Sequence, residues 1–248
     1  MKKVSLLLAL AIAVGIVVFA ASPVLAADGS GLSLPQRCHV DPIIVRGTPG
    51  NDTQVTLGTP NRDVIVQFGL GGDDTQYVTG LDANDWLVQD GGSGNDKQTA
   101  KGGGGDDYVF QSGGVGNDVQ FSEGGLGNDR LYLSGGAGND ETECQGGEGN
   151  DYICLSGGSG DDMLKAFGDK GDDLVLIDAG SENDAITYDV SEGNDQVFID
   201  GGRGYDTLTI NKLTQNYTVY DARGRVIHRE GTGGTAIRVR DIENIIYQ

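Results

Sequence analysis

An aspartate recurs at every eleventh position of this 248-residue chain, from Asp52 to Asp206, in fifteen copies without a change of register. We call this series the aspartate comb. A repeat of eleven residues cannot bury an apolar face alone, so its copies must stack on one another. The stretches between the glycine-rich loops are short and alternate in polarity, as β-strands do. The comb therefore predicts an all-β fold, a parallel β-roll or β-helix solenoid.

The residues before each aspartate indicate what its loop can bind. Glycine permits positive φ, which lets backbone carbonyls turn inward beside the carboxylate. Such an oxygen-only site suits a hard cation, calcium above all. Seven central repeats read Gly-Gly-x-Gly-Asn/Asp-Asp in full, from Gly91–Asp96 to Gly157–Asp162. The predicted metal ligands are Asp52, Asp74, Asp96, Asp107, Asp118, Asp129, Asp140, Asp151, Asp162, Asp173, Asp195 and Asp206.

Three loops lack key glycines, at residues 59–63, 81–85 and 180–184. Without glycine the same backbone turn is harder to adopt. We expect weak calcium binding or none there, so the predicted ligand set omits the aspartates that end these loops.

The five residues after each aspartate are predicted to form a strand, whose second and fourth side chains share the core face. In the later repeats this pair is apolar, as in Ile153 and Leu155. In the early repeats the second position alternates, reading Gln54, Ile65, Gln76 and onwards. The alternation predicts a turn of 22 residues, which contains two 11-residue repeats and adds one strand to each of two sheets.

The alternation also predicts columns of glutamine inside the early half. Gln54 and Gln76 belong to one column, and Gln67 and Gln89 to the other. Each amide would bond to the identical amide one turn away. In the alternative arrangement the strands turn over and the glutamines face water. Charged residues such as Lys97 would then point into the core, which disfavours that arrangement.

Composition limits the partners. The formal net charge is −20, and removal of a signal segment containing Lys2 and Lys3 makes it about −22. A nucleic-acid partner is excluded, because phosphate contacts need a basic face. About 11 divalent ions would cancel the charge of the mature chain, on the order of the number of loops.

Residues 1–26 are predicted to be a secretory signal peptide. Lys2 and Lys3 are followed by an apolar run, and small residues precede a cut ahead of Ala27. The alternative is an uncleaved membrane anchor, which the short run and the cleavage pattern disfavour. No other stretch is apolar enough to span a bilayer. The mature protein is therefore predicted to be extracellular, where calcium is millimolar and weak sites fill.

Three further segments follow the signal. Residues 27–46 are a leader whose Ile43–Val45 is predicted to be a strand covering the first turn, and 47–211 hold the fifteen repeats. Residues 212–248 lose the comb, and are predicted to be a β-rich C-terminal cap with strands near 217–220, 225–228 and 236–239. A solenoid needs such atypical ends, because its last strands are otherwise open edges.

Residues 47–211 resemble the RTX, or haemolysin-type, calcium-binding repeats of secreted bacterial proteins. That family uses Gly-Gly-x-Gly-x-Asp-x-apolar-x nonapeptides in a parallel β-roll. The resemblance implies calcium between loops of successive turns, held by the carboxylates of Asp96 to Asp173 in the comb and by loop carbonyls. The closing segment Asp241–Ile245 also looks like the end of such arrays. The period here is eleven and not nine, and the signal is N-terminal, whereas the family leaves through a C-terminal one.

The predicted function is that of a secreted calcium-binding β-solenoid with a structural or adhesive extracellular role. We predict no enzymatic activity, because every repeated carboxylate belongs to the comb, and His39 and His228 lie near no nucleophile pattern. One alternative is an accessory module of a secreted enzyme complex. Another is an ice-binding solenoid, which needs an unbroken threonine column. The candidate column runs Thr53, Thr75, Lys97, Val119, Glu141.

The expected partners are calcium ions and either a second copy of the chain or an extracellular matrix or cell-surface partner. One sheet would expose an aromatic stripe that suits docking. The alternative is that these aromatic residues are present because they favour β-strands, or that the leader or the cap covers them. The stripe comprises Val66, Trp86, Val88, Tyr108, Phe110, Tyr132 and Tyr152. Cysteines 38, 144 and 154 leave one thiol over, and we expect small buried side chains and no disulfide pair.

Overall fold

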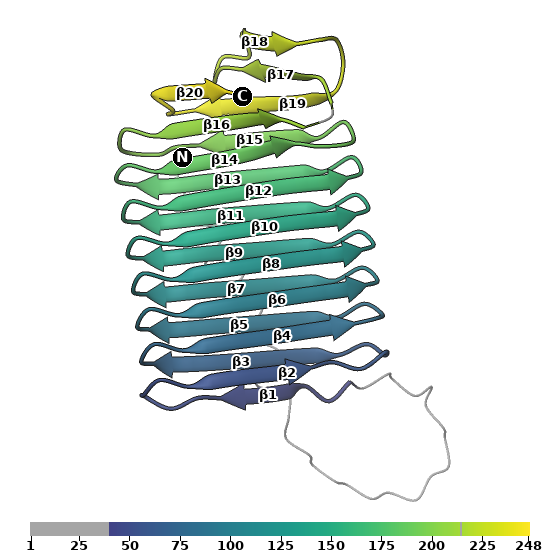
Figure 1. Ribbon diagram of the computed structural model, residues 1–248, viewed down its shortest axis with the longest axis vertical. Coiled ribbons are helices and arrows are strands. Elements are labelled where there is room, and N and C mark those ends of the chain that lie inside the picture. The colour runs from purple at the N-terminus through teal and green to yellow at the C-terminus, as the bar shows by residue number, and fades with distance from the viewer. Residues whose placement is uncertain (1–39, 214) are drawn as a thin grey trace, which may run out of the picture. The chain divides into compact units, whose positions relative to one another are not determined.

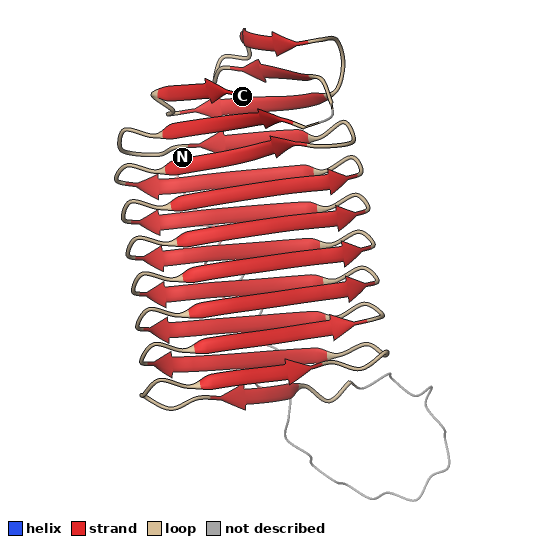
Figure 2. Cartoon of the chain, viewed as in Figure 1, coloured by secondary structure: helices blue, strands red, loops and turns tan. Residues whose placement is uncertain are grey.

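The computed structural model describes residues 40–213 and 215–248, so the signal prediction and most of the leader lie outside the described residues. All regular structure in these residues is β, in two stacked sheets (Figures 1 and 2). The first sheet contains β1 (Ile43–Arg46), β3 (Val64–Gly71), β5 (Trp86–Ser93), β7 (Tyr108–Val115), β9 (Arg130–Ala137), β11 (Tyr152–Ser159), β13 (Leu174–Ser181), β15 (Gln196–Asp200), β19 (Thr235–Arg240), β17 (Tyr217–Tyr220) and β18 (Val226–Glu230). The second contains β2 (Thr53–Leu57), β4 (Thr75–Leu81), β6 (Lys97–Gly104), β8 (Val119–Leu126), β10 (Glu141–Glu148), β12 (Met163–Lys170), β14 (Ala185–Val190), β16 (Thr207–Lys212) and β20 (Asn244–Tyr247).

Successive turns are related by 22 residues, as the alternating glutamines predict. Strand β7 pairs with β9 in parallel, and Val109 lies beside Leu131. In the other sheet β8 pairs with β10, and Gln120 lies beside Thr142. From β1 to β16 the chain crosses from one sheet to the other at every loop, so each 22-residue turn adds one strand to each sheet (Figure 1). The predicted parallel β-solenoid with two repeats per turn is confirmed, with about nine turns in all.

The central strands are longer than the sequence predicts. Strand β7 has eight residues and not five, because it continues through the first two loop glycines, of which Gly114 has a positive φ of 110°. Gly114 lies in register with Gly92 and with Gly136 on the flanking strands. A residue without a side chain lets the backbones of adjacent turns approach at the point where the loop begins. The loop proper is therefore short, and the aspartate closes it.

The predicted core face is confirmed. In most central strands the second, fourth and sixth residues are buried, and the others are partly or fully exposed. In the later turns these positions form an apolar core, with Ile153 and Val175 fully buried. Because the period of a strand is two, this register puts every flanking residue on the outer face.

Two ladders of glutamine occupy the core of the early turns. The Nε2 group of Gln98 donates to Oε1 of Gln76 at 2.8 Å, and Gln120 donates to Gln98 at the same distance. On the first sheet Gln89 donates to Gln67, and Gln111 to Gln89, both at 2.7 Å. Most of these amides also donate across the core to a backbone carbonyl, as Gln98 does to Ser112 at 3.0 Å. The prediction of stacked amides is confirmed, and among these described amides only Oε1 of Gln111, at the end of its ladder, is left buried without a donor.

The two ends of the stack differ. At the N-terminal end β1 pairs with β3 and covers the first turn of one sheet, as predicted, whereas β2 has β4 as its one partner among residues 40–213 and 215–248. At the C-terminal end β19 and β20 continue the two sheets as one more turn, and a hairpin of β17 and β18 is inserted before them. The cap thus extends the solenoid beyond residue 211.

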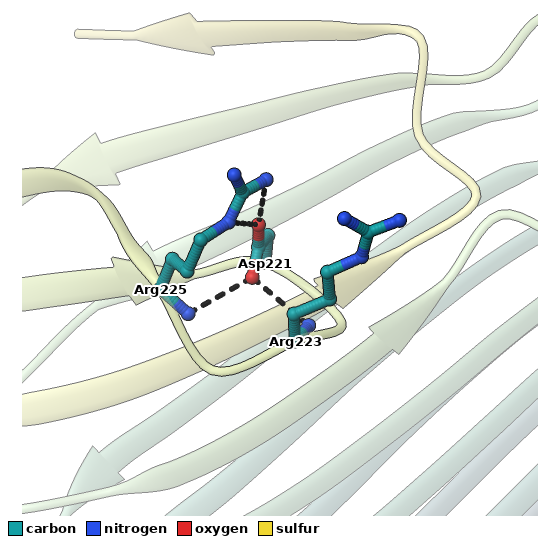
Figure 3. Close-up of polar contacts among 3 residues, drawn as sticks. All are labelled: Asp221, Arg223 and Arg225. Atoms are coloured by element: carbon teal, nitrogen blue, oxygen red, sulfur yellow. Dashed lines mark hydrogen bonds and ion pairs between the residues drawn. The ribbon is translucent and has the colours of Figure 1, made fainter.

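The turn of the hairpin is held by Asp221. Its Oδ1 accepts the backbone N–H groups of Arg223 and Arg225, each at 2.9 Å. Its Oδ2 accepts the guanidinium of Arg225 at 2.6 Å, while the Arg223 side chain points away (Figure 3). These bonds fix the hairpin that closes the first sheet.

The outer face of the first sheet carries the aromatic stripe in part. Val66 and Val88 stand in the same outward column as Phe110, yet they are only 4% and 6% exposed. The prediction that both valines are exposed was wrong, since short side chains in a column are exposed less than their register alone suggests. Cys144 is buried in the core and Cys154 is half-buried on the outer face, and both are free thiols.

Candidate metal centre

Each aspartate of the comb turns its side chain into the stack and ties two turns together. Oδ1 of Asp129 accepts the backbone N–H of Asp107, one turn earlier, at 2.7 Å. The same bond joins every comb aspartate from Asp74 to Asp206 to the one 22 residues before it, at 2.6–3.2 Å. One carboxylate oxygen therefore has a structural role that needs no ion. The repeat pattern predicts the comb but not this bond.

A second ladder runs along each edge in the opposite sense. Except at Arg62 and Tyr205, the residue just before a comb position is an asparagine or aspartate, whose side chain accepts the backbone N–H of its counterpart one turn later wherever such a turn follows. For example, Oδ1 of Asn95 accepts the N–H of Asn117 at 2.8 Å. These side chains are exposed, unlike the comb carboxylates, which are mostly buried. The Asn/Asp-Asp pair thus satisfies two backbone N–H groups per loop, which explains both residues of the motif.

The second carboxylate oxygen is the unusual atom of the site. In twelve comb aspartates Oδ2 is buried and accepts no hydrogen bond from the described residues. Buried acceptors without a donor are rare because they lose their hydration. The twelve are Asp74, Asp85, Asp96, Asp107, Asp118, Asp129, Asp140, Asp151, Asp162, Asp173, Asp184 and Asp206.

Backbone oxygens lie beside these atoms. A Cβ atom added to Gly124 would lie 2.4 Å from Oδ2 of Asp129 and 2.4 Å from the carbonyl oxygen of Gly146. The glycine is therefore required here, because any side chain would collide with both oxygens. Both oxygens lie beside the Cα–H group of Gly124, and no N–H or O–H group of the described residues donates to Oδ2, so a positive charge or a proton would offset the repulsion between them.

Burial changes the acidity of these groups. Loss of hydration raises the pKa of Asp107, Asp118 and Asp129 to about 7, partly offset by the bond from the backbone of the preceding turn. Neighbouring comb carboxylates add to the increase. The pKa of Asp173 rises furthest, to about 8, for the same reasons. The fold thus disfavours bare charged carboxylates at these loops and favours whatever neutralises them.

The donor set fits a hard cation only if the backbone contributes. Among residues 40–213 and 215–248 no group of three or more histidine, cysteine, aspartate or glutamate side chains is placed to hold a metal. A bound ion would take one Oδ2 and draw its remaining ligands from loop carbonyls and water. Oxygen ligands of this kind suit calcium, which accepts six to eight of them in flexible geometry.

Three comb aspartates have partners for Oδ2. Thr48 and Thr59, which stand where other loops have glycine, each donate a backbone N–H and a hydroxyl to Asp52 and to Asp63. Asp195 accepts the hydroxyls of Tyr188 at 2.8 Å and Thr235 at 3.1 Å. We therefore do not carry Asp52 and Asp195 forward as metal ligands, although the sequence predicts them.

Two of the loops that lack glycines keep the same geometry. Leu81 and Ala83 adopt positive φ, at 86° and 71°, in the loop that ends at Asp85, and Glu182 does so at 78° before Asp184. Positive φ is costly for these residues, so stacking against regular neighbouring loops must supply the stabilisation. Asp85 and Asp184 consequently present the same partnerless oxygen, and we add them to the candidate set.

One edge of the stack carries a groove beside the comb aspartates. A groove of about 360 Å³ lies along the loops that precede the first sheet. Asp129, Asp151 and Asp173 line it together with the exposed asparagines and Asp172. The partnerless oxygens of these three aspartates therefore lie next to a solvent-accessible groove.

Comparison of the chain with family models, with curated proteins and with solved structures gives no match. Within the described ranges, 40–213 and 215–248, the structure has no helix of the length and hydrophobicity that a membrane crossing requires.

Proposed function

We propose that this chain is a secreted calcium-binding β-solenoid with a structural or adhesive extracellular role. The observation that carries the proposal is the row of twelve buried, partnerless Oδ2 atoms in a chain of net charge −20. Oδ2 of each would bind calcium together with loop carbonyls, as in Asp129 with Gly146. Bound calcium would supply the positive charge that lets adjacent loops stack.

Calcium suits this site better than other ions. Transition metals favour nitrogen and sulphur ligands, which these loops lack. Magnesium demands near-ideal octahedral geometry and gives up its water reluctantly, whereas loop carbonyls and a single Oδ2 offer a looser arrangement. The resemblance to RTX repeats supports the same ion, and the predicted export supplies millimolar concentrations of it.

The rest of the chain supports a scaffold and not a reaction. Twelve comb carboxylates share the same buried, partnerless arrangement, and repeated positions suit a structural task. The ice-binding alternative loses support, because the register places Thr75 beside Lys97 and Val119 beside Glu141, so the threonine column is interrupted. The accessory-module alternative would be supported by a partner enzyme that co-purifies with the chain.

Calorimetric titration of the mature chain with calcium tests the proposal. Asp129→Ala removes a partnerless Oδ2 in the middle of the array and should lower the number of ions bound and the cooperativity. Asp63→Ala is the matched control, because Thr59 already satisfies Oδ2 of Asp63. Equal losses in both variants would contradict the assignment, and so would a wild-type chain that binds no calcium.

A further inference from the structure

The outer face of the first sheet carries a mainly apolar band along its first and third columns. The first and third residues of its strands point outward, and Trp86, Tyr108, Tyr132 and Tyr152 form a continuous stack of rings. Their centroids are 5.0, 5.2 and 5.4 Å apart. The outward columns continue through Phe110, Leu174, Leu176 and Phe198. Trp86 and Phe198 are each 38% exposed. We call this surface the aromatic face.

The outer face of the second sheet has a different character. Its corresponding columns contain charges, including Lys97, Glu141 and Glu143. Lys101 and Glu123 form an ion pair there at 2.6 Å. On the aromatic face the first and third columns between β3 and β15 contain one charged residue, Arg130. Copies of a chain of net charge −20 repel one another, so the aromatic face is where a second copy can approach at least electrostatic cost.

We propose that a second copy of the chain covers the aromatic face, sheet against sheet. The area is sufficient. The first five residues of a strand span about 17 Å, and the seven strands of the first sheet from β3 to β15 stack over about 34 Å. The aromatic face therefore measures roughly 570 Å² per copy. The two copies would bury about 1,100 Å², which reaches the lower range of specific interfaces.

The rim charges select one orientation of the two copies. With a two-fold axis along the strands and full overlap, Asp90 would face Asp178 of the second copy, and Arg130 would face itself. With the two-fold axis along the direction in which the strands stack, the first residue of each strand in one copy faces the fifth residue of the same strand in the other. These outward positions are the first and fifth columns. Arg130 then lies opposite Ser134, and no pair of like charges meets. Like charges face to face are destabilising, so the second orientation is preferred.

That orientation brings Cys154 of the two copies together. The third column lies on the axis, so each of its residues faces its own counterpart. Cys154 stands in this column between Tyr132 and Leu176 and is a free thiol. In the disfavoured orientation it would face Phe110. A cross-link between the two Cys154 thiols therefore reports both the face and the orientation.

The experiment uses the mature chain with Cys38→Ser in millimolar calcium, after far-ultraviolet circular dichroism has verified β structure. Sedimentation should give a dimer at micromolar concentration. A bifunctional thiol reagent shorter than the roughly 10 Å spacing of stacked sheets should join two chains, because the two thiols point toward each other across that space. Cys154→Ser should abolish the cross-link and leave the dimer intact. Burial raises the pKa of the Cys154 thiol to about 11, so the reaction needs hours at pH 8.

Two matched substitutions locate the interface. Tyr132→Glu places like charges at the axis and should shift sedimentation to a monomer. Phe121→Glu makes the same change at the same strand position of the opposite sheet and should leave the dimer intact. Both variants must keep their circular dichroism spectrum, which separates loss of association from loss of the calcium-dependent fold. A folded wild-type monomer, filaments that grow end to end, or a dimer that Phe121→Glu disrupts would each overturn the proposal.

Discussion

Replacement of Asp129 by asparagine separates the two roles of the comb carboxylate. The Asp129→Asn variant keeps the Oδ1 atom that accepts the N–H of Asp107. It replaces the partnerless Oδ2 by an N–H₂ group, which faces the carbonyl oxygen of Gly146 and can donate to it. The variant therefore preserves the tie between turns and removes the negative charge that a cation would neutralise.

The size of the effect without calcium follows from the pKa. Burial raises the pKa of Asp129 from 3.8 to about 7. The folded state thus binds a proton more tightly than the unfolded chain. This group contributes no penalty below pH 3.8, and stability falls as pH rises from 3.8 to 7 by about 1.4 kcal/mol per pH unit. Asparagine does not ionise, so the variant does not lose this stability as the pH rises. Asp129→Asn should therefore stabilise the calcium-free fold by about 3 kcal/mol at about pH 6 and by almost nothing at about pH 4.

Calcium should reverse the effect of Asp129→Asn on the stability of the fold. With the ion bound, Asp129→Asn has lost a charged ligand, and the variant should be less stable than the wild type. Thermal unfolding followed by far-ultraviolet circular dichroism, with chelator between pH 4 and 6 and with millimolar calcium at pH 7.5, measures both effects. Asp63→Asn is the control, since it breaks bonds from Thr59 and should destabilise under every condition. Equal destabilisation of Asp129→Asn with chelator and with calcium would refute the assignment of two roles.

Three further outcomes are expected. Gln98→Ala should lower the free energy of unfolding, measured in urea, by about 2–4 kcal/mol, because it leaves a cavity and removes one hydrogen bond from each of two neighbouring amides. Thr99→Ala on the outer face should lower it by under about 1 kcal/mol. Gly116→Ala should lower the free energy of unfolding by more than about 3 kcal/mol in the same assay, because φ is 141° and the added Cβ would lie 1.8 Å from the Gly94 carbonyl oxygen. Gly104→Ala should be tolerated, because the nearest atom to its added Cβ is 3.6 Å away. Chelator at pH 7.5 should remove most β structure, as judged by circular dichroism, and the spectrum should recover with calcium but poorly with magnesium.

Most of the fold could be predicted from the sequence because the repeat records the geometry directly. The eleven-residue spacing gives the strand and loop, and the alternation of Gln54, Ile65 and Gln76 gives the 22-residue turn. Side-chain periodicity gives the buried face. Strand length could not be predicted in this way, because pairing through Gly92 and Gly114 depends on the close approach of adjacent turns and not on strand propensity.

The candidate site was only partly predictable. The comb identifies the carboxylates, but the fate of each oxygen depends on neighbours from other turns. Asp195 is satisfied by Tyr188 and Thr235, which lies 40 residues away. Asp85 keeps its partnerless oxygen even though its loop lacks glycines, because stacking holds Leu81 at positive φ. Local motifs cannot report either effect, although threonine in place of the second loop glycine, as at Thr48, is a usable signal.

The most direct test of calcium binding is to count the ions on the folded mature chain by native mass spectrometry at pH 7.5. We predict on the order of ten ions per chain in a compact state, and an expanded charge distribution after chelation, because partnerless carboxylates at most loops need neutralising. A compact chain that carries no calcium at this pH would contradict the proposed function. The buried aspartates would then be neutralised by protons, and the loops would stack without a metal.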